Sequence, residues 1–410
     1  MTQLFRTILK NGRIPRILFA LISFSLLIVG LKIAVTSVTS FGGDYYVYWQ
    51  AGRAIFIRDV SPYDPSTKEI IQHGIYGDLA SPEEDQLAFV YPPFSLLLIL
   101  PVVNLSYDWA QAYWIAFNLV LVIGATFILF KKPPLWWLAS LIFFYPVIRS
   151  VILGSFSLII AAGCMLAYVL INNEVSEAPW KQYFAGIILA WCAMKPHLSW
   201  MIIIFLLLQS IHRRERYVLV GLASGGLFLS AISWILVPTW ISDWINAITN
   251  YLGYVPNQPI LISWSKILGL SWETFGVKFI ITLIIVLATV FLLLSWWKGH
   301  LPDFLFLGWL ILLNQLFNPN PLSMLSDQIV FLIPLIIWMK RIDTSSWGRD
   351  LTWFSFVVIP WVLFGIYYAG KEPYAVASGL ATLFVIWWLV MLIIHQINRR
   401  ILLSNARITA

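Results

Sequence analysis

Long apolar runs, separated by short polar segments, repeat along the whole chain. A helix of about 20 apolar residues crosses a hydrocarbon core of about 30 Å, and the runs predict about twelve such spans. We expect them at residues 17–38, 88–104, 111–130, 135–149, 152–171, 183–210, 217–237, 277–297, 304–317, 328–339, 351–369 and 374–396. The predicted fold class is therefore all-α, a polytopic transmembrane helical bundle that forms one integral membrane domain over residues 1–410.

Basic residues gather in the polar segments between these runs. The basic groups are Lys10, Arg13 and Arg16, then Arg213, Arg214 and Arg216, then Lys340, Arg341 and Arg349, and finally Arg399, Arg400 and Arg407. Such clusters are typical of cytoplasmic loops, so both termini are expected in the cytoplasm. An even number of spans then puts loops 39–87 and 238–276 on the outer side.

Composition supports a membrane protein. Of the 410 residues, 60% are hydrophobic and 11% are charged, whereas soluble domains average about 25% charged residues. The net charge of +7 follows from the basic loops and does not indicate nucleic-acid binding. Cys164 and Cys192 both lie inside apolar runs, which favours neither a disulfide framework nor a cysteine metal site. The run 17–38 is too long for a signal-peptide core, so we expect an uncleaved anchor.

The first outer loop, 39–87, is the longest hydrophilic stretch. From Tyr45 to Arg58 its aromatic residues recur at helical spacing, which predicts a short amphipathic helix lying in the membrane interface. The prolines at 62 and 65 end that helix with turn chemistry. The second outer loop, 238–276, carries aromatic residues suited to the headgroup level, among them Trp240, Trp244, Tyr251, Tyr254 and Trp264.

Asp44 is the most informative polar residue, because it follows the first apolar run directly. Two interpretations are open. The carboxylate can cap the helix that begins near Gly43 by accepting a bond from an amide two or three residues on. It can also act as a general base that takes the proton of an acceptor hydroxyl, although a position at a helix N-terminus would lower its pKa.

Further candidate residues carry charge or aromatic faces near the outer surface. Lys195 lies inside an apolar run, where a charge is costly unless it faces a partner or a cavity, and Pro196 is expected to break the helix there. We list Arg53, Tyr63, Tyr91, Lys195, His197, Lys266 and Asp327 as candidate substrate-binding residues. Each has a structural alternative, such as interface anchoring for the tyrosines and helix capping, which we favour, for Asp327. Arg149, at a predicted span end, is interpreted as a topology determinant.

Several stretches resemble glycosyltransferase family 87, a family of membrane enzymes with the GT-C fold. The resemblance rests on Gly43-Asp44-Tyr45-Tyr46-Val47-Tyr48-Trp49 with Ser61-Pro62-Tyr63-Asp64, on Tyr91-Pro92-Pro93, on Gly154-Ser155-Phe156-Ser157 and on Met194-Lys195-Pro196. It covers residues 40–215 well and later residues only in outline. Ser155 stands where the family usually has Gln, and Asp327-Gln328 stands where relatives often have His or paired polar residues.

This resemblance implies a function. The chain would move a hexose, mannose by analogy, from a polyprenyl-phosphate donor to a hydroxyl of a glycolipid or glycan acceptor, with inversion. Asp44 would be the catalytic carboxylate, with the donor phosphate near Lys195 or Arg53. No Asp-x-Asp motif stands in an outer loop, so neither a metal ion nor another cofactor is expected. We expect a bacterial plasma membrane location, with the site facing outward. The alternatives are a lipid or lipid-sugar transporter and a membrane scaffold.

Overall fold

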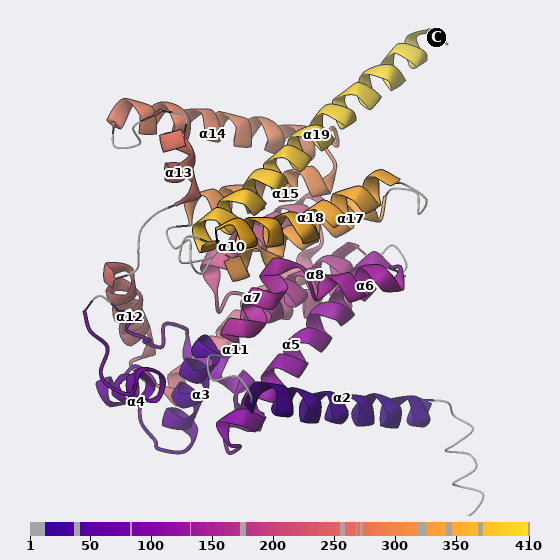
Figure 1. Cartoon of the computed structure of the whole chain (residues 1–410). Helices are drawn as coiled ribbons and strands as arrows, with labels where there is room; N and C mark the ends of the chain where they lie inside the picture. The colour runs from indigo at the N-terminus through magenta and orange to yellow at the C-terminus, as the bar shows by residue number, and fades with distance from the viewer. Residues whose placement is uncertain are drawn as a thin grey trace, which may run out of the picture.

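The computed structural model describes residues 13–36, 42–82, 84–131, 133–172, 178–254, 259–267, 269–270, 274–318, 325–341, 347–367 and 372–408. Within these ranges the regular elements are all helices (Figure 1). The first half comprises α2 (Arg13–Thr36), α3 (Gly43–Phe56), α4 (Pro65–Tyr76), η1 (Pro93–Leu98), η2 (Leu100–Val102), α5 (Tyr107–Phe130), α6 (Leu135–Leu141), α7 (Tyr145–Leu153), α8 (Ser157–Asn172), α9 (Pro179–Cys192) and α10 (Pro196–His212). The second half comprises α11 (Arg216–Leu236), α12 (Trp240–Tyr254), α13 (Ile260–Ile267), α14 (Phe275–Trp297), α15 (Asp303–Phe317), η3 (Gln328–Phe331), α17 (Leu332–Met339), α18 (Trp347–Ile366) and α19 (Glu372–Ile408). The all-α prediction is confirmed for the described residues.

The predicted number of about twelve spans is not confirmed within the described residues. Five described helices are long and apolar enough to cross a membrane, and a sixth is gained if the bent pair α6 and α7 counts as one span. Further apolar helices, such as α8, α10 and α15, have only 15–17 residues. The segment predicted as a span at 88–104 is built mainly from two short 3₁₀ helices, η1 and η2. Prolines at 92, 93 and 101 explain this, because each removes a backbone donor.

Two other predicted spans are broken. The run 183–210 forms α9 and α10, separated at residues 193–195, as expected from Pro196. The run 135–149 forms α6 and α7, which meet at 45°. Broken helices at membrane depth are tolerated where the freed backbone groups are buried in protein or line a cavity. Both breaks therefore indicate places where freed backbone groups are buried in the protein or line a cavity.

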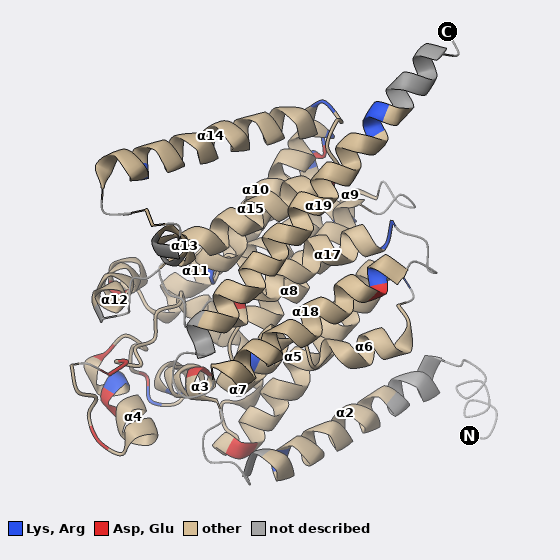
Figure 2. Ribbon diagram, turned by 45° about the horizontal axis from the view of Figure 1, so that its top comes forward, with Lys and Arg blue, Asp and Glu red and all other residues tan. Residues whose placement is uncertain are grey.

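The core of the bundle joins helices that are distant in sequence. α9 and α11 approach closely, because Gly186 and Gly221 let the backbones touch: a Cβ on Gly186 would lie 2.3 Å from the Val218 carbonyl oxygen. Small residues are the usual means of bringing membrane helices together. The remaining core is formed by α5, α8, α10, α15 and α17 together with part of α19. Few charged residues lie within it (Figure 2).

The described part of segment 39–87 folds into two helices rather than the one predicted. α3 agrees with the predicted amphipathic helix within two residues at each end, and its aromatic face, which includes Tyr45, Tyr48 and Trp49, is buried. α4 was not predicted. It begins after Asp64, whose side chain accepts a bond from the Ser66 amide at 2.8 Å. α3, α4 and α12 lie together at one end of the bundle (Figures 1 and 2). Trp244 of α12 donates to the Val90 carbonyl at 3.0 Å, which links α12 to the segment just before η1.

Candidate active site

Asp44 lies in the first turn of α3, where two neighbouring helices fix the backbone. The Gly42 amide donates to the carbonyl of Ile152 in α7 at 2.8 Å, and the Tyr107 hydroxyl of α5 donates to the Gly42 carbonyl at 2.8 Å. Gly42 is the N-cap residue, and no side chain caps the helix. The capping interpretation of Asp44 is therefore wrong. No described group donates a hydrogen bond to its carboxylate, which is partly exposed.

The surroundings of Asp44 are mostly aromatic. Tyr48 of α3 stacks on Phe156 with ring centroids 4.0 Å apart, and its hydroxyl donates to the Tyr91 hydroxyl at 3.3 Å. Burial among these groups raises the pKa of Asp44 from 3.8 to about 6, against the opposing field of Lys195. The helix N-terminus was expected to lower the pKa of Asp44. The pKa is raised instead, because desolvation is the larger effect. A carboxylate with such a pKa is still mostly ionised at pH 7 and is a stronger base than an ordinary aspartate.

Gly154 sets how closely α7 approaches α3. It ends α7 in the left-handed conformation, with φ +72°, and a Cβ there would lie 2.4 Å from the Cβ of Tyr45. Its carbonyl accepts a bond from the Trp114 indole at 2.8 Å. Only glycine fits both the backbone angle and the contact. This glycine therefore holds the residue next to Asp44 against the bundle.

Lys195 occupies the break between α9 and α10. It is the N-cap residue of α10, and Pro196 begins that helix. Because the chain turns here, the Lys195 side chain reaches into the interior, where the residue is only 3% exposed. The sequence predicted that this charge needs a partner or a cavity, and the structure provides a partner.

That partner is Asp327, which lies 132 residues further along the chain. The Lys195 ammonium is 2.5 Å from Asp327 Oδ1, and the Ser157 hydroxyl donates to the same oxygen at 2.7 Å. Lys195 also donates to Ser157 at 3.0 Å. His197 Nε2 lies 3.2 Å from Asp327 Oδ2. We call Ser155, Ser157, Lys195, His197 and Asp327 the buried cluster, although the His197 side chain itself is 46% exposed.

Asp327 does not cap a helix through its side chain, so the favoured capping interpretation is wrong. Its side chain is fully buried and is the counter-charge of Lys195. Ser155 and Ser157, whose hydroxyls are 2.7 Å apart, complete the cluster. Sequence analysis gave these serines no role. The available signal was two hydroxyls at alternate positions inside an otherwise apolar run, directly after Gly154.

Asp44 and the buried cluster lie on the same side of the bundle. The charges of Lys195, Arg149 and Asp327 all act on the Asp44 carboxylate, as does that of Asp85 in the first outer loop. Phe156, which stacks on Tyr48, lies between the two serines of the cluster in sequence. One region therefore contains three carboxylates, two cations and a half-exposed imidazole.

The other predicted substrate-binding residues differ in how close they lie to Asp44. Tyr91 lies with Asp44, and Tyr63 supports it, because the Tyr63 hydroxyl donates to the Tyr91 carbonyl at 2.5 Å. Arg53 is nine residues after Asp44 and so lies on the opposite face of α3. It donates to the Val103 carbonyl at 3.2 Å and stacks over Trp49. Lys266 belongs to α13, and its side chain lies outside what the structure describes.

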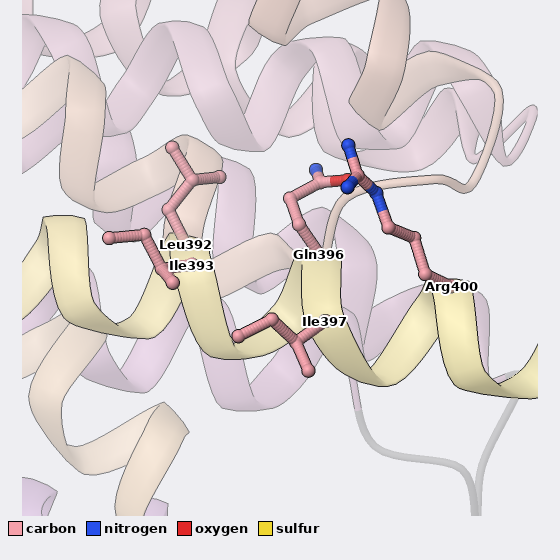
Figure 3. Close-up of a pocket in the computed structure, with 5 residues that line it drawn as sticks. All are labelled: Leu392, Ile393, Gln396, Ile397 and Arg400. Carbon is pink, nitrogen blue, oxygen red and sulfur yellow. The ribbon is translucent and has the colours of Figure 1, made fainter.

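A separate open hollow lies on α19. It has a volume of about 300 Å³ and is lined by Leu392, Ile393, Gln396, Ile397 and Arg400 (Figure 3). All five residues come from one helix, and none of them is a carboxylate or a histidine. The hollow therefore offers none of the acid–base groups found around Asp44.

Fold and composition together indicate a helical membrane protein in which Asp44 and the buried cluster lie close to each other. Comparison with protein families gives the class of enzyme. The model of Glycosyltransferase family 87 matches residues 89–319, more than half of the chain, so the protein belongs to that family and is a glycosyltransferase. Arg149, the two serines and Lys195 lie within the match, whereas Asp44 and Asp327 lie outside it. Searches of curated proteins and of solved structures found no match.

Proposed function

We propose that the enzyme transfers a hexose, mannose in the first instance, from a polyprenyl-phosphate donor to an acceptor hydroxyl, with inversion at the anomeric carbon. Asp44 is the general base. The observation that carries this proposal is the Asp44 carboxylate itself, which is partly exposed, accepts no bond from a described group and has a pKa raised to about 6. Family membership supports transfer of a sugar rather than transport or scaffolding.

The chemistry balances with the groups present. Asp44 accepts the acceptor hydroxyl proton while the hydroxyl oxygen forms a bond to the anomeric carbon. The bond between that carbon and the phosphate oxygen breaks, and polyprenyl phosphate departs with the electron pair. Asp44 then returns the proton to solvent. No group on the chain is oxidised or reduced. Rigid placement of the base contributes through orientation, and removing a general base typically costs about 10²–10⁴ in rate.

The buried cluster would stabilise this site rather than perform the proton transfer. Lys195 is held by Asp327 and Ser157, and its positive field lowers the cost of an ionised Asp44. Tyr91 and Tyr63 supply aromatic surfaces beside the base, of the kind on which sugars pack. We place this site on the outer face of a bacterial plasma membrane. Clusters of basic residues occur near both termini and in other polar segments, and such clusters are typical of the cytoplasmic side.

The test is transfer by the full-length enzyme in membranes supplied with radiolabelled polyprenyl-phosphate mannose and a membrane glycolipid extract. Wild type should release polyprenyl phosphate as label enters the acceptor. Asp44→Asn should lose about 10²–10⁴ of the rate, whereas Asp64→Asn, which changes a helix-capping aspartate of the same loop, should retain it. Wild-type transfer by Asp44→Asn would remove Asp44 from the mechanism. Movement of intact donor across vesicles without cleavage would instead indicate transport.

A further inference from the structure

Arg149 is a cation with no protein partner in the part of the chain that the structure describes. It lies in α7, the second half of the bent helix pair. Its Nε atom is shielded from solvent and makes no hydrogen bond, and no carboxylate lies within ion-pair distance. A buried donor without an acceptor is costly, and an ionisable group inside a membrane bundle is a functional candidate by default.

The position of Arg149 relative to Asp44 is fixed by the backbone. Ile152, one turn after Arg149, accepts the hydrogen bond of the Gly42 amide, two residues before Asp44. Gly154 packs against Tyr45 immediately beyond. The two charges are close enough to influence each other, yet they form no ion pair within 4.0 Å. A sugar phosphate fits between a base and a cation, with its sugar beside the base and its phosphate beside the cation.

The other cations of this region are already engaged. Lys195 is bound to Asp327 and Ser157. Arg53 points to the Val103 carbonyl on the opposite face of α3, and Arg58 donates to the Gln50 backbone and side chain. Arg149 is partly exposed, so part of its side chain faces accessible space. Among the described arginines of α3 and α7 and the lysine of the buried cluster, Arg149 is the one that makes no hydrogen bond to the protein.

We propose that Arg149 binds the phosphate of the lipid-linked donor and of the departing lipid phosphate. This inference rests on the proposed function and replaces Lys195 and Arg53 as the expected phosphate anchors. Guanidinium donors match phosphate oxygens in pairs, which a lysine cannot do. The donor is a phosphodiester with one negative charge, and the product is a phosphomonoester that gains a second charge near neutral pH. Arg149 therefore stabilises the transition state and product more than the donor.

The experiment measures binding of undecaprenyl phosphate to the full-length protein in phosphatidylcholine nanodiscs. Arg149→Gln should weaken binding about 10- to 100-fold, the loss expected for a charged hydrogen-bond pair. Arg149→Lys should be intermediate. Arg53→Gln is the matched control, because it removes an arginine that already has protein contacts, and its affinity should stay near wild type. Uncharged undecaprenol should bind all variants alike. In transfer assays kcat should fall more than KM for donor rises.

Folding and phosphate source are tested in the same series. Arg149→Gln should leave the apparent Tm unchanged or higher, because no hydrogen bond or ion pair is lost. A lower Tm together with weaker undecaprenol binding would indicate a structural role and overturn the proposal. Equal competition by inorganic phosphate or phosphatidylglycerol would overturn it as well, because the site would then read any phosphate. If wild type binds undecaprenyl phosphate and transfers sugar but Arg149→Gln does so equally, only this inference fails. If wild type does neither, the proposed donor is wrong.

Discussion

Replacing the two halves of the buried ion pair separately and together tests how the cluster is stabilised. Lys195 and Asp327 side chains are 4% and 0% exposed, and their charged atoms are 2.5 Å apart. Lys195→Met leaves a carboxylate buried with only Ser157 and the imidazole of His197 beside it. Removing one member of a buried pair costs about 3–5 kcal/mol, because the other charge remains desolvated. Asp327→Leu should cost a similar amount for the same reason.

The double variant Lys195→Met/Asp327→Leu should recover most of this loss. An apolar pair of similar volume is often as stable as a buried ion pair, so the two changes should couple by about 3 kcal/mol or more. The assay is denaturant unfolding in mixed micelles, followed by tryptophan fluorescence, with Lys298→Met on an exposed helix end as a control within about 0.5 kcal/mol of wild type. Additive losses in the double variant would refute the ion pair as the reason for the burial of both residues.

Three further predictions follow from the same geometry. Because Asp44 must be ionised to act as a base, kcat/KM should fall as the pH drops through about 6, and Asp44→Asn should abolish that limb of the pH profile. A raised pKa means that ionised Asp44 opposes folding, fully above pH 6 and not at all below its ordinary value of 3.8, so Asp44→Asn should raise the apparent Tm at pH 7.5 but not at pH 4. Gly154→Ala forces an alanine into the left-handed conformation, which costs about 1–2 kcal/mol, and creates a clash with Tyr45. This variant should therefore lower both Tm and kcat. Gly77→Ala, where the added Cβ meets open space, should lower Tm only.

Local sequence signals predicted the local parts of the fold. The aromatic spacing in the first outer loop predicted α3 because one face of that helix is buried throughout. Pro196 predicted the break between α9 and α10 because proline cannot donate within a helix. α4 escaped prediction since its residues are mostly polar and its start is hidden among turn-forming residues. The run 88–104 was misread because its hydrophobicity outweighed its prolines.

Sequence analysis selected Asp44, Lys195, His197 and Asp327 as candidates, but it did not predict the contacts among the last three. Asp44 and Lys195 were noticeable because each charge follows or interrupts an apolar run. The pairing of Lys195 with Asp327 depends on the packing of α8, α10 and η3, which no local pattern encodes. Arg149 was interpreted as a span end because the bend between α6 and α7 was not predicted. In the structure Arg149 lies in α7, partly exposed and with its Nε atom shielded from solvent.

The weak attachment of α14 has a practical consequence. Only Leu292 and Trp296 of its 23 residues are buried against the rest of the protein. Annular lipid holds such a segment in place. Removing that lipid during purification leaves an apolar helix exposed to detergent. Solubilisation is therefore the step at which this enzyme is most easily damaged, and its preparation calls for early reconstitution into bilayers.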